Sequence, residues 1–459
     1  MHQPIISISG IRGIPGETLS PPDLAAYAEA FVRFCGDGPI VIGYDGRPTG
    51  VAILDIVRGT IRLAGASVID IGLAPTPSVQ LAVEHFDARG GIAVTASHNP
   101  SQWNGLKFLD STGVFLDAEQ NARYLALLHN GSPDYAGWER LGSAVYERSF
   151  DAVHRRLVLA HPALDAVRIR ARQYSVVVDA VNASGSFIVP DLLRELGCKV
   201  LPLHCDGSGV FPHPPEPLPN NLEGLGKAVL EHHADLGIAV DPDADRLVLY
   251  TEKGEPFGEE YTVTTAVLAA LASAPDGVQD VVVNLSTTRA VDDVAQRFGA
   301  VLHRTPVGEI NVVKRMLALG ALVGGEGSGG VIVPAIHAGR DSLVGIAFVL
   351  QALSSFDGTA SEFRASLPDY VIRKFKYSSA GRDAAAILQR ATQEFAAFTL
   401  NTEDGVRIDF PEGWVHIRKS NTEAILRVIA EARTSEEACS LAERVAIACL
   451  GKDAAPIQG

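Results

Sequence analysis

The sequence predicts an α/β protein with three similar mixed α/β domains in tandem and a smaller α+β domain at the end. The chain has 459 residues, more than one hydrophobic core accommodates, so several domains are expected. The order buried strand, helix, glycine, second strand occurs three times, and short strands with a hairpin turn follow. From the ends of these repeated units and the start of the hairpin-connected strands, we predict domains at residues 1–150, 151–252, 253–367 and 368–459.

The composition excludes several classes of protein. With 47% hydrophobic and 20% charged residues, the chain is typical of a globular protein and not of a disordered one. The net charge of -15 argues against a nucleic-acid or anionic-membrane partner, so a phosphorylated ligand must meet local clusters of Arg and Lys. No apolar run could cross a bilayer, and Met1–Pro4 lacks the start of a signal peptide. The five cysteines form no C-x-x-C pair, which predicts reduced thiols and a cytoplasmic protein.

The amino-terminal segment predicts a short strand followed by a helix. Ile6 and Ile8 alternate with serines, and the segment ends in Gly10-Ile11-Arg12-Gly13. The two glycines there permit close approach of the backbone to a ligand, and a turn with a solvated Arg12 is the alternative. Ser20 precedes two prolines and an aspartate, which predicts a capped helix start at that point.

A unit of three strands then repeats along the chain, with coincidence between ordinary α/β units as the alternative. The first strands, each running into a loop, lie in residues 41–47, 176–182 and 281–286. The second strands follow a glycine, in residues 65–70, 197–201 and 299–303. The third strands cover residues 91–94, 236–240 and 321–323.

The loops after the third strands are chemically different. They cover residues 95–100, 241–246 and 325–330. Ligands favour the carboxyl ends of strands and the clefts between domains. Three similar domains would therefore direct three different loops towards one shared site.

The first loop, T-A-S-H-N-P, places Ser97 where a strand ends, because Asn99-Pro100 prevents its continuation. Capping of a turn is the simplest alternative. Ser97 and His98 are consecutive, so we expect their side chains to diverge, and G-x-S-x-G is absent, so a hydrolase triad is not supported. A serine beside a carboxylate loop and a phosphate-binding loop favours phosphoryl transfer through a phosphoserine.

The second loop contains Asp241, Asp243 and Asp245 at alternating positions. In an extended loop these carboxylates would point to one side and bind a hard divalent cation, Mg²⁺ in preference to Ca²⁺. Arg246 stands where an EF-hand requires glycine, and a strand-like run follows it, so that motif is excluded. A solvated acidic turn is the alternative.

The third loop matches G-x-G-x-x-G over Gly325–Gly330. A nucleotide-binding loop needs a helix directly after the glycines, and Val331-Ile332-Val333-Pro334 excludes one. Glu326 and Ser328 instead provide groups that can bind neighbouring sugar hydroxyls.

The last domain begins near Pro368 and concentrates cations between two strands. Arg418 to Thr422, with Arg427, suits a phosphate dianion, and an exposed hairpin end is the alternative. Thr434 and Glu437 predict a capping box for the final helix, which Gly451 ends. The other predicted elements are a helix over 383–398 and strands over 406–410, 414–418 and 424–429.

On T-A-S-H-N-P and D-P-D-A-D-R, with the other two loops in the same order, the chain resembles the α-D-phosphohexomutases over its whole length. That superfamily contains phosphoglucomutase, phosphomannomutase and phosphoglucosamine mutase. The resemblance implies Ser97, His98, Arg12 and Lys107 as catalytic residues, and Asp241, Asp243 and Asp245 with Ser97 as metal ligands. It implies substrate binding by Arg246, Thr305, Gly308, Glu326, Ser328, Arg418, Ser420, Asn421, Thr422 and Arg427.

The resemblance also implies the architecture and the reaction. The last domain is expected to be TBP-like, the four domains to surround a central cleft, and the protein to be a monomer or homodimer. The phosphoserine donates to a hexose 1- or 6-phosphate, and the bisphosphate turns over and returns its other phosphate. One Mg²⁺ per chain and hexose 1,6-bisphosphate as activator are implied, with a phosphorylated hexose as substrate.

The expected substrate is glucosamine phosphate, in the manner of archaeal-type phosphoglucosamine mutases, because of the form G-G-E-G-S-G-G. Gly330 stands where many bacterial members have histidine, and Ala424 where a proline is common. Glu326 and Ser328 would contact hydroxyls that these hexoses share. A phosphomannomutase/phosphoglucomutase is therefore the alternative, and a non-catalytic phosphosugar-binding protein is a remote one.

Overall fold

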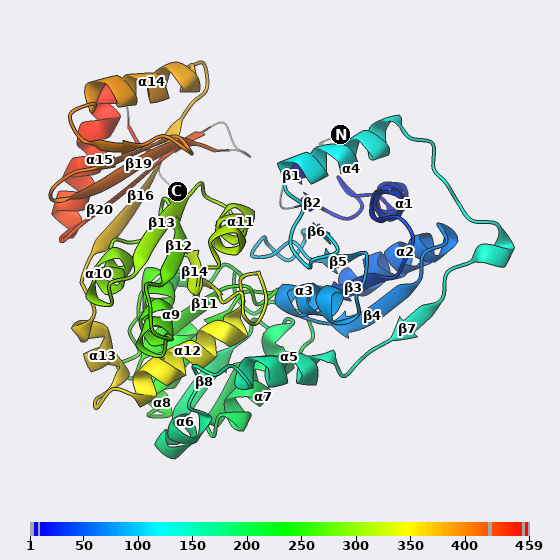
Figure 1. Cartoon of the computed structure of the whole chain (residues 1–459), viewed down its shortest axis with the longest axis horizontal. Helices are drawn as coiled ribbons and strands as arrows, with labels where there is room; N and C mark the ends of the chain where they lie inside the picture. Colours follow the sequence, from blue (N-terminus) through cyan, green and yellow to red (C-terminus); the bar gives the residue numbers. More distant parts are fainter. Residues whose placement is uncertain (1–3, 8–9, 421–424, 452–454, 458–459) are drawn as a thin grey trace.

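The computed structural model describes residues 4–7, 10–420, 425–451 and 455–457 and contains four β-sheets along the chain (Figure 1). We number the corresponding units domains I to IV. Among the described residues, no helix is both long and apolar enough to span a membrane.

Domain I is a mixed seven-stranded sheet in the order β1-β2-β6-β5-β3-β4-β7. Its core on one face includes residues of α1, α2 and α4, and a second core includes residues of α3 and α5. The predicted cap is confirmed, because the Ser20 side chain accepts a hydrogen bond from the backbone N–H of Asp23. The elements are β1 (Ile5–Ser7), β2 (Gly10–Gly13), α1 (Pro21–Cys35), β3 (Ile40–Tyr44), α2 (Gly50–Leu63), β4 (Val68–Leu73), α3 (Thr76–His85), β5 (Gly90–Val94), β6 (Asn104–Leu109), α4 (Ala118–Asn130), β7 (Ala144–Tyr146) and α5 (Phe150–Leu159).

Domains II and III are two four-stranded sheets that share one continuous hydrophobic core. Domain II comprises α6 (Ala166–Arg172), β8 (Ser175–Asp179), α7 (Gly185–Glu195), β9 (Lys199–His204), α8 (Glu223–Glu231), β10 (Leu236–Val240) and β11 (Leu247–Thr251). Domain III comprises α9 (Glu259–Ala272), β12 (Asp280–Asn284), α10 (Ala290–Arg297), β13 (Val301–Thr305), α11 (Glu309–Leu319), β14 (Val323–Glu326), β15 (Gly330–Ile332), α12 (Ser342–Ser354) and α13 (Ala360–Ser366).

The three repeated units have one strand order. It reads β6-β5-β3-β4 in domain I, β11-β10-β8-β9 in domain II and β15-β14-β12-β13 in domain III. In each unit the three predicted strands are parallel, and the strand after the functional loop is antiparallel. The predicted repeat is therefore confirmed.

The predicted third strand of domain III, residues 321–323, is wrong. β14 covers Val323–Glu326 and contains two glycines, which weaken the apolar signal of a strand. Glu326 therefore lies on a rigid strand end and not in a flexible loop.

Domain IV is an antiparallel sheet in the order β16-β20-β19-β18-β17. α14 and α15 contribute to one core with this sheet, and Thr434 caps α15 with the predicted capping box. β16 was not predicted because the exposed residues Arg373, Lys374 and Lys376 interrupt the alternation expected of a strand. The predicted helix 383–398 ends earlier, at Glu394. The elements are β16 (Val371–Ser378), α14 (Ala384–Glu394), β17 (Thr399–Asn401), β18 (Val406–Asp409), β19 (Gly413–Lys419), β20 (Ile425–Ala432) and α15 (Ser435–Leu450).

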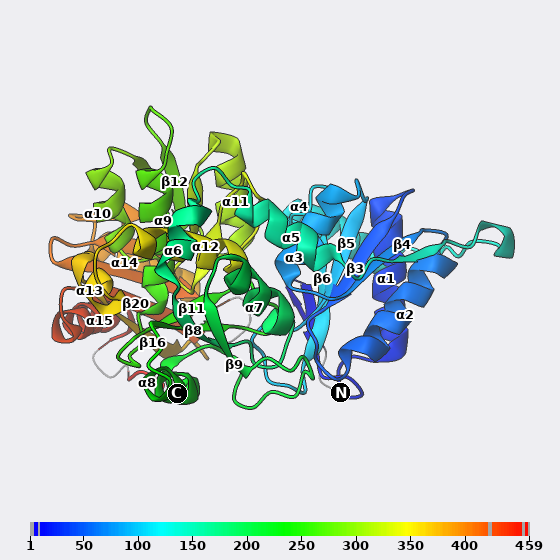
Figure 2. The ribbon, with the colours of Figure 1, turned by 90° about the horizontal axis from the view of Figure 1, so that it is seen from below.

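The domains are arranged around domain III. In Figures 1 and 2, domain I lies at one end of the molecule and domain IV at the other, beside domain III. Side chains from domains I and III both reach the functional loop of domain II, as described below.

Candidate active site

The three loops expected to form the site follow β5, β10 and β14, which occupy equivalent places in their sheets. Two cations from other domains contact the loop of domain II. Lys107 Nζ on β6 lies 2.6 Å from Asp243 Oδ2, and Arg340 Nη2 lies 2.7 Å from Asp245 Oδ2. The first and third domains thus converge on the carboxylates of the second.

Ser97 has a left-handed backbone, with φ of 52°, and is 2% exposed. Its Oγ lies 3.3 Å from Asp241 Oδ2 and 3.3 Å from His98 Nδ1. The expectation that the Ser97 and His98 side chains diverge is therefore wrong, because the left-handed turn removes the alternation of an extended chain. Burial, with repulsion from Arg246 and Arg12, lowers the pKa of His98 to about 2.

Arg47 supports the Ser97 loop from within domain I, and its side chain is fully buried. Its guanidinium donates to the carbonyls of Ser97 at 2.5 Å and Asn99 at 2.7 Å, and to those of two further loop residues. Asp45 fixes the guanidinium through Nε at 3.0 Å and also accepts a hydrogen bond from Thr95 Oγ1 at 2.6 Å. The hydrogen bonds of this network come from domain I itself, and Phe211 of domain II packs against the guanidinium.

Asp241, Asp243 and Asp245 are buried, and one carboxylate oxygen from each lies within 4.8 Å of the others. The predicted reason, an extended loop, is wrong: Ala244 has φ of 48°, and the loop turns back so that the carboxylates converge. Burial and repulsion from Asp245 and Asp243 raise the pKa of Asp241. Asp243 Oδ1 and Asp245 Oδ1 are buried and accept no hydrogen bond among the described residues. These oxygens fit a hard divalent cation.

Most of the remaining carboxylate oxygens contact groups from neighbouring domains. Thr76 Oγ1 and Lys107 Nζ each donate to Asp243 Oδ2 at 2.6 Å. Burial would raise the pKa of Asp245, but attraction to Arg340, Lys107 and Arg246 outweighs it and lowers the pKa. Burial likewise would lower the pKa of Lys107, yet Asp243 and Asp245 raise it, so Lys107 is a cation.

The sugar-binding residues predicted in domain III lie close together. Glu326 Oε1 accepts from Asn284 Nδ2 at 2.8 Å and from the N–H of Gly308 at 3.0 Å, and Oε2 accepts from Arg340 Nη1 at 2.8 Å. Thr305 ends β13 and is buried, whereas Ser328 is partly exposed. Since Arg340 also contacts Asp245, one guanidinium connects this group to the carboxylate loop.

Two further predicted cations lie beside these loops. Arg12 Nη1 donates to Asn99 Oδ1 of the serine loop at 2.9 Å, and Arg246 N donates to Asp241 Oδ1 at 3.2 Å. The Nε atoms of Arg12 and Arg246 are buried without a hydrogen-bond partner in the described part of the chain. Buried guanidinium donors in this state suit phosphate oxygens.

The predicted phosphate-binding residues lie on neighbouring strands of domain IV. Arg418 of β19 is directly opposite Arg427 of β20, and Arg427 is opposite Lys376 of β16. Arg418 Nε lies 3.1 Å from Asp404 Oδ2, and Ser420 is buried. Asn421 and Thr422, predicted for the same loop, lie outside the described residues.

Domain IV contacts domain III through partly buried polar groups. Asp404 Oδ2 accepts from the N–H of Val307 at 3.0 Å, next to Gly308 of the predicted sugar-binding residues. His416 Nδ1 lies 2.9 Å from Ser286 Oγ, and His416 Nε2 donates to the carbonyl of Asp404 at 2.5 Å. Asp404 therefore links Arg418, one of the three opposed cations of domain IV, to the loop of domain III that contains Val307.

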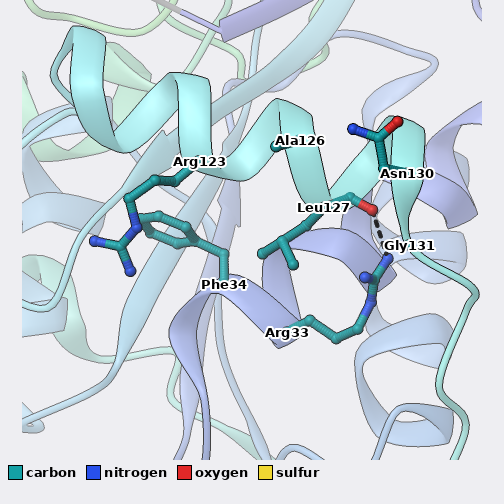
Figure 3. Close-up of a pocket in the computed structure, with 7 residues that line it drawn as sticks. All are labelled: Arg33, Phe34, Arg123, Ala126, Leu127, Asn130 and Gly131. Atoms are coloured by element: carbon teal, nitrogen blue, oxygen red, sulfur yellow. Dashed lines mark hydrogen bonds between the residues drawn. The ribbon is translucent and has the colours of Figure 1, made fainter.

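A separate pocket lies on the surface of domain I between α1 and α4 (Figure 3). Arg33 in this pocket already pairs with Glu29 at 2.6 Å and donates to the carbonyl of Leu127 at 3.1 Å, while Arg123 lies over the ring of Phe34. Both arginines of the pocket therefore already have partners within the protein, and no predicted site residue lines the pocket. The pocket lining consists of Arg33, Phe34, Arg123, Ala126, Leu127, Asn130 and Gly131.

The combination of three repeated α/β domains, a serine facing buried carboxylates and cations from several domains is that of an enzyme transferring phosphoryl groups. Models of four phosphoglucomutase/phosphomannomutase domains match in order: alpha/beta/alpha domain I at residues 5–132, domain II at 156–254, domain III at 260–370 and the C-terminal domain at 376–448. The chain belongs to the phosphoglucomutase/phosphomannomutase family and is a phosphohexomutase, an intramolecular phosphotransferase.

Individual relatives agree with this assignment over nearly the whole chain. A phosphoglucomutase/phosphomannomutase of Thermococcus kodakarensis is 35% identical over 437 residues, which is 94% of each chain. A protein of Methanopyrus kandleri named as a probable phosphoglucosamine mutase is 33% identical over 439 residues, 94% of this chain and 95% of its own. A crystal structure of a family member from Burkholderia thailandensis has the same fold, with a TM-score of 0.84 at 24% identity over 98% of this chain and 100% of that one.

Proposed function

We propose that the chain interconverts hexose 1-phosphate and hexose 6-phosphate through a phosphoserine at Ser97 and a bisphosphate intermediate. The observation that supports this role most directly is the 3.3 Å separation of Ser97 Oγ from Asp241 Oδ2. A phosphoryl group on Ser97 would lie beside the carboxylate cluster, where a bound cation can neutralise its charge.

We propose Mg²⁺ as that cation, held by Asp241, Asp243 and Asp245, because the ligands are carboxylate oxygens and two buried oxygens of the cluster accept no hydrogen bond from the described residues. When bound, the ion would neutralise charge on the transferred phosphoryl group. Lys107 orients the cluster by occupying Asp243 Oδ2, so the free Oδ1 atom faces the ion site.

The cationic side chains would position the phosphates. Arg12 and Arg246 have buried Nε donors beside the serine loop and can bind oxygens of the transferring group. The row of Arg418, Arg427 and Lys376 in domain IV suits the phosphate that is not being transferred. In the first step the Ser97 Oγ–P bond breaks as a sugar hydroxyl oxygen bonds to phosphorus, and the hydroxyl proton passes to Ser97 Oγ. In the second step the bond between the other phosphorus and its sugar oxygen breaks as Ser97 Oγ bonds to that phosphorus, and the serine proton passes to the sugar oxygen.

For the sugar, we propose glucosamine phosphate first, with mannose and glucose phosphates as the second candidates. Relatives named for each of these activities align with the chain at 33–35% identity. Glu326 is fixed by Asn284, Gly308 and Arg340, and it can accept hydrogen bonds from hydroxyls common to these sugars. Hexose 1,6-bisphosphate is the proposed activator, because it can phosphorylate Ser97.

The test is mutase turnover of glucosamine, mannose and glucose 1-phosphates with Mg²⁺ and a trace of hexose bisphosphate. We expect one sugar to be converted much faster than the others and Ser97→Ala to abolish conversion. Ser101→Ala is the matched control, because Ser101 is exposed just beyond the same loop. If none of the three sugars is converted by enzyme phosphorylated at Ser97, the proposed substrates are wrong.

A further inference from the structure

Domain II contains a second group of metal-ligand atoms, formed by Asp179, His204 and His213. One ligand atom from each lies within 4.8 Å of the others. Asp179 Oδ2 is 2.8 Å from His204 Nδ1 and 3.0 Å from His213 Nε2. The group lies on β8 and β9, whereas the Asp241–Asp245 loop follows β10.

The sheet places the first two residues together. Asp179 ends β8 and His204 ends the parallel strand β9, and a register shift after Val178 sets them directly opposite each other. Asp179 is buried, while the side chains of His204 and His213 are 27% and 16% exposed. The partial exposure of both imidazoles leaves the group accessible from solvent.

The two hydrogen-bond acceptors beside His213 cannot both be satisfied by a neutral imidazole, which carries a single N–H. His213 Nδ1 lies 2.8 Å from the carbonyl oxygen of Pro214, and a carbonyl only accepts, so Nδ1 must hold the proton. The lone pair of Nε2 in a neutral imidazole then faces the carboxylate of Asp179, which also only accepts. Either a second proton or a metal ion must lie between these atoms. A backbone carbonyl on the far nitrogen is the usual arrangement for a metal-bound histidine.

A second group with the same ligand types, His154, His337 and Asp341, shows no such conflict. His154 Nδ1 lies 2.9 Å from the hydroxyl of Ser78, which can donate, so Nε2 is free to donate to Asp341 at 2.7 Å. His337 Nε2 donates to the same carboxylate at 3.1 Å. This group is fully buried. Both histidines can donate to Asp341 from a neutral ring, although His337 Nδ1 has no hydrogen-bond partner among the described residues, so this group serves as a control.

We propose that Asp179, His204 and His213 bind a transition-metal ion of the Zn²⁺ class, separate from the cation at Asp241–Asp245. Two imidazole nitrogens and one carboxylate oxygen suit Zn²⁺ and disfavour Mg²⁺, which prefers oxygen ligands. Ligand atoms around a tetrahedral Zn²⁺ are roughly 3.3 Å apart, so the present separations of 2.8 and 3.0 Å need to open by only a few tenths of an ångström.

The ion would fix a segment that packs on the support of the serine loop. Residues 205–212 connect His204 to His213, and within them Gly209 approaches Gly46 so closely that a Cβ there would lie 1.8 Å from the Gly46 carbonyl oxygen. Phe211 lies under the guanidinium of Arg47, 4.9 Å from ring centre to Cζ. A metal at this position would therefore hold domain II against the residue that supports Ser97.

The test uses Co²⁺ as a spectroscopic probe, added to full-length protein in saturating Mg²⁺ so that the carboxylate site is blocked. We expect one equivalent of Co²⁺ with the intense visible absorption of a tetrahedral complex, and displacement by Zn²⁺. His204→Gln and His213→Gln should each weaken binding by more than about 100-fold, since even changes outside the ligand shell cost about 10–100-fold. Asp241→Asn and His154→Gln should leave this binding unchanged.

Limited proteolysis provides a readout that does not depend on colour. Zn²⁺ should slow cleavage within residues 205–212 in the wild type and have no effect in His213→Gln.

The alternative to a metal ion between His213 and Asp179 is a doubly protonated His213. Burial lowers the pKa of His213, but its hydrogen bond and attraction to Asp179 outweigh burial and raise the pKa. Absence of Co²⁺ binding, or binding that survives both His→Gln substitutions, would show a protonated hydrogen-bond network and overturn the proposal.

Discussion

The serine loop of domain I and the carboxylate loop of domain II follow equivalent strands, yet they are stabilised in different ways. Arg47 and Asp45, both in domain I, hold the serine loop. The carboxylate loop depends instead on Lys107 of domain I and Arg340 of domain III. The proposed nucleophile is thus held by hydrogen bonds from its own domain, whereas the carboxylate cluster has all its cationic partners only when three domains are assembled.

This difference follows from the chemistry of the two loops. A serine hydroxyl is neutral and needs only a fixed backbone, which buried hydrogen bonds to carbonyl groups provide. Three buried carboxylates repel one another and need positive charge close by. Cations from neighbouring domains satisfy this need and also make the site sensitive to domain assembly.

The largest expected effect is that of Ser97→Ala, which removes the proposed nucleophile without changing either supporting network. We expect kcat to fall by about 10⁴-fold or more, since removal of a covalent nucleophile has an effect of this order. The thermal unfolding midpoint should stay close to that of the wild type. Turnover retained at a tenth of the wild-type value would place the transferred phosphate elsewhere.

Lys107→Met should remove one of the contacts between domains I and II, the ion pair with Asp243. Lys107 is 3% exposed, and removing one partner of a buried ion pair costs about 3–5 kcal/mol. Urea unfolding should show this loss without metal and partial recovery when Mg²⁺ is added, because the cation replaces the missing charge. Lys314→Met is the control: Lys314 also links two domains, to Asp117 at 2.8 Å, but it is 60% exposed, so its loss should cost at most about 1 kcal/mol. Equal losses in the two variants would contradict the comparison.

Arg47→Lys should weaken the serine loop while leaving the cation site intact. A lysine ammonium cannot reach all the carbonyls that the guanidinium contacts, and we expect about 3 kcal/mol of lost stability and a clear fall in kcat. Mg²⁺ should not restore this stability, in contrast to Lys107→Met. Arg62→Lys is a matched control, since Arg62 donates to a single carbonyl, that of Gly142. Rescue of Arg47→Lys by Mg²⁺ would show that the two loops are not supported independently.

The contact of domains III and IV should depend on pH through His416. Burial lowers the pKa of His416 to about 4, below the usual 6.5 of the unfolded chain. As the pH falls, His416 therefore binds a proton in the unfolded state before it does in the folded state. The stabilisation present above about pH 6.5 is lost towards pH 4, and about 2 kcal/mol of it is lost by pH 5. Urea unfolding of the wild type and of His416→Gln across this pH range measures the loss of stability. An identical pH slope in both proteins would rule out His416 as the source.

Contiguous motifs were predictable from the sequence, and contacts between distant residues were not. Ser97 and the three aspartates stand in short runs after buried strands, so their positions at one edge followed from the strand pattern. Arg47 acts on Ser97 from 50 positions away, Arg340 on Asp245 from 95, and Thr76 on Asp243 from 167. No local pattern distinguishes these residues from ordinary polar side chains. The two left-handed residues, Ser97 and Ala244, also changed how side chains face each other.

The most direct test of the central claim is a chase of labelled phosphate through Ser97. The enzyme would be phosphorylated with hexose bisphosphate carrying radioactive phosphate, freed of sugar, and mixed with unlabelled hexose 1-phosphate in a single turnover. We predict that the label resides on the peptide containing Ser97 and passes to hexose bisphosphate within one catalytic cycle. Label on a different peptide, or label that remains on the protein while product forms, would contradict the account.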